Sequence, residues 1–247
     1  MSGIALKMPA SASSHVPNRV LDHAFFTTMI LVLWTIIVLG FSKTYFLAGM
    51  VRAPLPNLLI HLHGAAFTLW MVLLLVQTTL ITARKVKIHR TLGLMTFGLA
   101  VLMVVLGVLS GIDAMRRGVA PLGLDAQTFF IIPFSDMVCF SVLVFYSYRT
   151  RLRAELHKRL ILIASIALMG AGVARWPIQF LQDHPPAQDS VLLALLLALA
   201  AFDLLQLHRV SKATSLGGIP LFLIHLVRVP LGMTPVWHAF TSYLMRH

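Results

Sequence analysis

The chain has 247 residues, of which 58% are hydrophobic and 11% are charged, and its mean hydropathy is +0.87. Soluble domains carry about 25% charged residues, so this composition excludes a soluble domain of useful size. The net charge of +12 comes from basic residues at the ends of apolar runs, as in membrane proteins. We therefore expect the lipid bilayer, and no nucleic acid, as a partner. The single cysteine, Cys139, excludes an internal disulfide and a paired-cysteine metal motif.

The first segment, residues 1–21, is polar and lacks the apolar centre of a signal peptide. We expect a loose tail here and a single transmembrane helical domain over residues 22–247. Apolar runs long enough to cross a bilayer then predict an all-α, polytopic transmembrane helical bundle of about seven spans. These runs are 23–41, 58–82, 91–112, 127–148, 158–176, 190–208 and 219–244.

The seventh run is the weakest of the predicted spans. Pro220, Pro230 and Pro235 interrupt it, and His225 and Arg228 lie within it. Proline in a membrane helix is tolerated only where neighbouring groups satisfy the freed carbonyls. We therefore expect either a kinked span or a re-entrant segment at the end of the chain.

Basic residues alternate between the loops, and this alternation predicts the orientation of the bundle. The loops after the second, fourth and sixth spans are the richer set. They hold Arg84, Lys85, Lys87, Arg90, Arg149, Arg151, Arg153, Lys158, Arg159, Arg209 and Lys212. Cytoplasmic loops carry the excess of Lys and Arg. The N-terminus is therefore predicted to be cytoplasmic and the C-terminus, after seven spans, to lie outside.

Two histidines, His89 and His157, begin spans that run outward from the cytoplasmic side, so their depths match. On a helix, His89 lies above Gly93, Thr96 and Ala100. This is a groove of small side chains. A haem between two helices needs such a groove and an imidazole from each side, and histidine is a common axial ligand of haem. The pair therefore predicts a site for haem b.

The residues that flank this pair could make additional contacts with haem, and the pair itself has two alternative interpretations. Arg90 and Arg159 could bind haem propionates through charge-assisted hydrogen bonds. In a second reading, His89 and His157 only cap basic helix ends and contact lipid headgroups. In a third, both join His208 at a zinc or iron site with an open coordination position.

A second pair of histidines lies at the outer end of the second span. His61 and His63 are two residues apart, so they point to nearly opposite sides of a regular helix. The face of His61, which includes Gly64, is the roomier one for a cofactor. The fourth span has no histidine, so a second ligand would have to come from His184 or His238.

Ionisable side chains within the spans predict buried partners. Asp136 lies in the fourth span, and Asp203 and Gln206 share a face of the sixth. A carboxylate inside a membrane is costly unless it is paired, so we expect a partner for each. Arg175 and Trp176, at the outer end of the fifth span, indicate either an interfacial belt or an anchor for a quinone headgroup or an anionic substrate.

One pattern in residues 58–176 resembles a known family. It comprises His61 to Gly64, the HRTLG of His89 to Gly93, the HKR of His157 to Arg159, and Arg175. It resembles a bacterial family of predicted multi-span membrane proteins of unassigned function, which implies a multi-helix fold in the bacterial inner membrane. More distantly, it is similar to the di-haem membrane cytochromes of the b561 and ferric-reductase kind. That likeness implies bis-histidine haems and electron transfer across the bilayer. The chain departs from those cytochromes because its fourth span lacks a histidine.

Three functions remain open on these observations. The favoured one is a membrane redox protein, a b-type haem-binding electron-transfer subunit linked to quinol. No nicotinamide or flavin motif is present, so it would need a redox partner. The second is an intramembrane enzyme that depends on zinc or iron. The third is a transporter or an accessory subunit of a larger membrane complex without a cofactor, which the interrupted seventh run favours because discontinuous helices line transporter sites.

Overall fold

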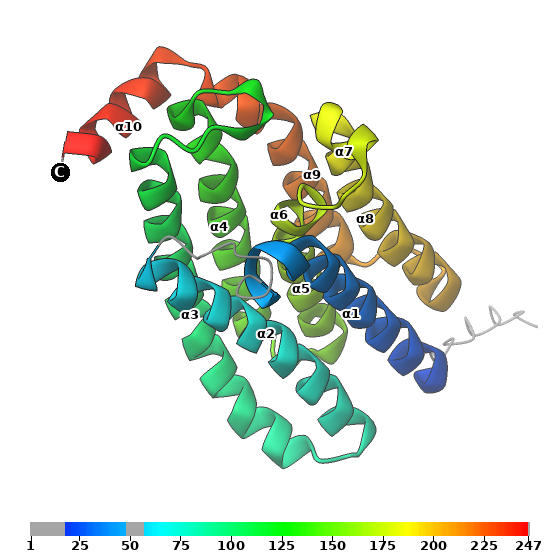
Figure 1. The fold of residues 1–247 in the computed structure, drawn as a ribbon. Helices are drawn as coiled ribbons and strands as arrows, with labels where there is room; N and C mark the ends of the chain where they lie inside the picture. The colour runs from blue at the N-terminus through cyan, green and yellow to red at the C-terminus, as the bar shows by residue number, and fades with distance from the viewer. Residues whose placement is uncertain (1–17, 48–56, 247) are drawn as a thin grey trace, which may run out of the picture.

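The computed structural model describes residues 18–47 and 57–246, and all regular structure in these ranges is helical (Figure 1). The predicted loose tail lies mostly outside the described residues, although α1 already begins at Arg19. The elements are α1 (Arg19–Phe41), η1 (Ser42–Phe46), α2 (Leu58–Thr82), α3 (Val86–Arg116), η2 (Pro121–Gly123), α4 (Ala126–Arg149), α5 (Ala154–Ala167), α6 (Gly170–Val173), α7 (Gln179–Asp183), α8 (Pro185–Leu207), α9 (Lys212–Gly232) and α10 (Pro235–Arg246).

Seven helical segments in the described part of the chain are long and apolar enough to cross a membrane, which confirms the predicted class of a multi-span helical bundle. These segments are Arg19–Phe46, Leu58–Thr82, Val86–Arg116, Ala126–Arg149, Ala154–Val173, Ala187–Leu207 and Lys212–Gly232. The protein is therefore a multi-pass membrane protein.

The bounds of the seventh span differ from the prediction. It begins at Lys212, where the Ser211 side chain accepts a hydrogen bond from the amide of Ala213, and it ends at Gly232. The helix continues through Pro220 and Pro230 as one segment. The polar residues of its first turn lower the local hydropathy. The predicted span therefore began too late in the sequence. Residues after Gly232 form the separate helix α10, which lies against α3, α4 and α9 (Figure 1).

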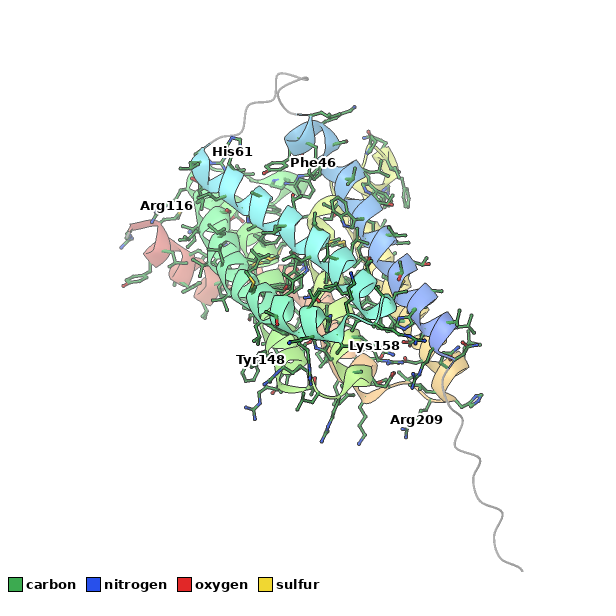
Figure 2. All side chains as sticks on the ribbon, turned by 90° about the horizontal axis from the view of Figure 1, so that it is seen from below. Phe46, His61, Arg116, Tyr148, Lys158 and Arg209 are labelled. Atoms are coloured by element: carbon green, nitrogen blue, oxygen red, sulfur yellow. The ribbon has the colours of Figure 1, made fainter. Side chains whose placement is uncertain are left out.

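The two ends of the bundle are marked by different side chains. Figure 2 shows Phe46, His61 and Arg116 at one end, and Tyr148, Lys158 and Arg209 at the other. We call these the outer end and the inner end, after the orientation that the loop charges predict. Successive connections between the spans fall alternately at these two ends, because the chain crosses the membrane repeatedly.

Helix α5 forms the centre of the bundle. Its residues Ile163, Ala164, Ile166 and Ala167 are fully buried, and it packs against α1, α4, α8 and α9. The fifth span breaks after Ala167, and the short helix α6 follows. There, a Cβ on Gly40 of α1 would collide with the backbone of Gly172. The two backbones can approach this closely only because both positions are glycine.

The buried carboxylates have the partners that the sequence led us to expect. Asp203 Oδ1 lies 2.6 Å from the guanidinium of Arg159, and Asp203 Oδ2 accepts hydrogen bonds from the Ser211 amide and the Thr214 hydroxyl. Asp203 therefore joins α8 to α5 and to the start of α9. In the same way, Asp136 Oδ1 accepts a hydrogen bond of 2.8 Å from Arg228.

Candidate functional site: two cavities within the bundle

An inner cavity of about 340 Å³ opens between α2, α3 and α5, and both His89 and His157 line it. The sequence predicted that these two histidines lie at matching depth. The structure brings them to one space from two different helices. The cavity is also lined by Trp70, Gln77, Arg90, Gly93, Phe97 and Arg151.

Each of these imidazoles has one nitrogen engaged by a neighbouring polar group. His157 Nδ1 lies 2.7 Å from the hydroxyl of Ser147 and 3.1 Å from its carbonyl oxygen. In its hydrogen-bonded orientation, the side-chain nitrogen of Gln77 donates to His89 Nδ1 at 2.6 Å. Ligating histidines donate the proton of their second ring nitrogen to an acceptor, which fixes the ring and its tautomer. His157 fits this arrangement through the Ser147 carbonyl oxygen and keeps Nε2 for a ligand. At His89 the Gln77 amide donates to Nδ1, so the neutral ring carries its proton on Nε2, and metal binding there would require the amide to turn its oxygen toward Nδ1.

The walls of the inner cavity combine small and flat side chains. A Cβ added to Gly93 would meet the Gln77 side chain at 3.7 Å, an ordinary van der Waals contact, so this backbone is not tightly packed. Thr96 also lines the cavity. Ala100, the third predicted member of the groove, is buried in the helix packing instead. On the other side, the Phe97 ring lies 6.3 Å from that of His157.

Two arginines, Arg90 and Arg151, supply positive charge to this cavity. Arg90 was a predicted cofactor-binding residue. Arg159 was another, but its guanidinium is fully buried and is held by Asp203 and by Glu155 at 2.6 Å. It does not line the cavity, because the helix turns it toward α8. Sequence reasoning missed Arg151, since a loop residue has no helical period that predicts where it points.

The predicted triad of His89, His157 and His208 is not brought together. Within residues 18–47 and 57–246, no group of three or more His, Cys, Asp or Glu side chains could hold a metal ion. His208 lies at the C-terminal end of α8, where it is exposed and has a positive φ of 52°. It is not among the residues that line the cavity of His89 and His157.

An outer cavity of about 460 Å³ lies between η1, α2, α3 and α4, and His63 lines it. His61 is exposed and is not among the lining residues. The face that the sequence indicated as roomier is filled, because the ring of Tyr45 packs against Gly64. The Tyr45 hydroxyl donates to the carbonyl oxygen of His61 at 3.3 Å. The face of α2 that borders the outer cavity is therefore the face of His63.

The second ligands considered for an outer cofactor lie elsewhere. His238 Nε2 is 3.1 Å from the Thr128 hydroxyl, and His184 Nδ1 is 3.0 Å from the carbonyl oxygen of Phe180. Among the described residues that line the outer cavity, His63 is the one histidine. A bis-histidine pair can therefore be drawn in the inner cavity and not in the outer one.

A cluster of ionisable side chains adjoins the outer cavity through Asp136, which lines it. Arg228 bridges Asp136 and Asp189, and His225 Nδ1 lies 3.0 Å from Asp189 Oδ1. Because α9 begins at Lys212, His225 lies about 20 Å along the helix, in its outer half.

Comparison of the chain with protein-family models, with curated proteins and with solved structures finds no match. The chemistry must therefore be argued from the two cavities themselves. The inner one presents two oriented imidazoles and two arginines. The outer one presents one imidazole, one carboxylate, two arginines and four hydroxyl-bearing side chains, Ser110 among them.

Proposed function

We propose that this protein is a b-type haem-binding electron-transfer subunit of the bacterial inner membrane. The observation that carries the proposal is the inner cavity, where His89 and His157 face one space from α3 and α5. His157 Nδ1 faces the carbonyl oxygen of Ser147, as expected of a histidine that would bind a metal through Nε2. The residues present therefore suit a flat macrocycle that is held from both faces.

Each lining residue has a defined task in this proposal. Nε2 of His89 and Nε2 of His157 would hold the iron, and Arg90 and Arg151 would hold the propionates by charge-assisted hydrogen bonds. Trp70 and Phe97 would cover the ring and exclude water. When bound, haem supplies a carrier of single electrons. The protein sets the potential of that carrier through its axial ligands and its exclusion of water.

The proposal implies partners on both sides of the electron transfer. No nicotinamide or flavin motif is present in the sequence, so electrons must come from another molecule. A quinol in the bilayer is the donor class that we propose, and a redox protein or larger membrane complex is the acceptor. Both partners meet the protein in or at the membrane.

A second candidate function is transport, or an accessory role, without a cofactor. The cluster of Asp136, Arg228, Asp189 and His225 favours it, because ionisable side chains inside membrane spans often mark ion or substrate paths. A colourless protein would agree with this candidate and not with the first.

Haem content tests the proposed function. The protein should be produced in cells supplied with a haem precursor, purified in mild detergent and assayed as the pyridine haemochrome. We expect about one haem b for each chain, because one bis-histidine pair is present. A pure, monodisperse protein without haem would overturn the proposal.

Labelling of single cysteines tests the proposed cytoplasmic N-terminus. The native Cys139 is buried, so an added cysteine at an exposed position reports its own side. Leu152→Cys, in the loop between α4 and α5, should react with an impermeant maleimide from the cytoplasmic side only. Leu58→Cys, at the start of α2, should react from the other side only. The reverse result would contradict the orientation.

A further inference from the structure

The outer cavity contains two buried polar atoms that have no hydrogen-bond partner among the described residues, His63 Nδ1 and Ser110 Oγ. A buried polar group without a partner costs about 1–3 kcal/mol. Both side chains line the cavity, and Ser110 is only 8% exposed. The cost is removed if a bound molecule supplies the missing hydrogen bonds.

These two atoms come from facing helices and serve one region of the cavity. The His63 ring on α2 lies against the backbone carbonyl of Leu106 on α3. Ser110 follows Leu106 by four residues, so it lies about one turn further along the same face of α3. Both side chains therefore line the part of the cavity between α2 and α3.

The charged groups that line this cavity already have partners. Arg175 donates to the carbonyl oxygen of Ala171, and its guanidinium lies 4.6 Å from the centre of the Phe41 ring. Asp136 is paired with Arg228. An uncharged ligand with oxygen atoms at its edge needs only the two open positions.

The remaining walls suit a flat, lipid-soluble ring. They are mostly apolar and aromatic, and the side chains include Phe41, Phe67, Phe129 and Met137. The cavity lies among membrane-spanning helices, so its ligand can arrive from the bilayer. Trp70 lines both this cavity and the inner one, so its side chain borders both spaces.

We propose that the outer cavity binds the ring of a lipid-soluble quinone or hydroquinone, with His63 and Ser110 as its hydrogen-bonding partners. The inference rests on the proposed function, because it places the class of electron donor named there at a definite site. It concerns binding, so it can be measured on protein with or without haem. The ring lies among Phe41, Phe67 and Phe129, with its oxygen toward α2 and α3.

The test is a titration of the purified full chain with a quinone that carries a ten-carbon tail. Quenching of tryptophan fluorescence reports binding, because Trp70 lines the cavity. We expect saturable quenching, with the affinity about tenfold weaker in Ser110→Ala and in His63→Leu, since each loses one hydrogen bond in a buried site. His61→Ala, an exposed position two residues from His63, is the matched control and should bind as the wild type does.

The outcomes separate this inference from the proposed function, because haem content is measured on the same samples. Absence of saturable binding to the wild type would overturn the inference, even in a haem-loaded protein. Wild-type affinity in both Ser110→Ala and His63→Leu would also overturn it. If quinone binds and both variants weaken it while no haem is found, the quinone site stands and the haem proposal fails. Ser110→Ala removes one oxygen atom, and an unchanged elution volume shows that it folds.

Discussion

Replacing either His89 or His157 with alanine should lower the haem content per chain by about tenfold or more. The expectation follows from the inner cavity, where these side chains approach one space from two helices. Removal of a group that only orients a ligand costs about 10–100-fold in metal affinity, and removal of the ligand itself should cost more. The measurement is the pyridine haemochrome, normalised to protein, for each variant purified in the same detergent.

Two further variants test whether the loss of haem is specific to the two proposed ligands. Ser147→Ala should reduce haem affinity without abolishing it, because His157 Nδ1 keeps the carbonyl oxygen of Ser147 as a partner at 3.1 Å. His208→Ala should keep the full haem content, since His208 lies at the end of α8 and does not line the cavity. Full haem in both His89→Ala and His157→Ala would show that the ligands are other residues.

Breaking the buried pair of Arg159 and Asp203 should give the largest loss of stability in the chain. The side chains are 1% and 0% exposed, and their closest atoms are 2.6 Å apart. Removing one member of such a pair costs about 3–5 kcal/mol, because the other charge stays buried without its partner. Arg159→Met would leave Asp203 with only the Ser211 amide and the Thr214 hydroxyl. Unfolding by added denaturing detergent, followed by circular dichroism, measures the change.

A double variant separates the charge from the packing. Arg159→Met combined with Asp203→Leu should be less destabilising than the sum of the two single changes, because no uncompensated charge remains. As a control, Arg117→Met breaks a partly exposed pair with Asp113 and should cost only about 0–1 kcal/mol. Equal effects of the buried and the exposed changes would contradict the role given to Asp203.

Hydropathy predicted the spans well because a bilayer demands long apolar helices, whose composition is visible in the sequence. The cost of charge in the membrane likewise predicted that Asp136 and Asp203 have partners. Neither argument could say which residues those partners are. Arg159 looked available for a propionate because its ion pair with Asp203 joins helices that are far apart in the sequence.

The candidate site was predictable where helical periodicity applies. His89, Gly93 and Thr96 follow the spacing of one helix face, and all three line the inner cavity. The outer cavity was harder, because η1 brings Tyr45 over the face that contains Gly64. A reversal of the chain direction of this kind produces no periodic pattern of side chains in the sequence. The break after Ala167 was missed for a similar reason, since no proline marks it.

The absorption spectrum of the wild-type protein, recorded before and after dithionite and then with carbon monoxide, tests the central claim most directly. Two histidines on one iron predict the sharp reduced α-band of a six-coordinate b-type haem. They also predict that carbon monoxide leaves the spectrum unchanged, because both axial positions are filled. A flat visible spectrum in protein from cells supplied with haem precursor, or a haem that binds carbon monoxide at once, would contradict the site between His89 and His157.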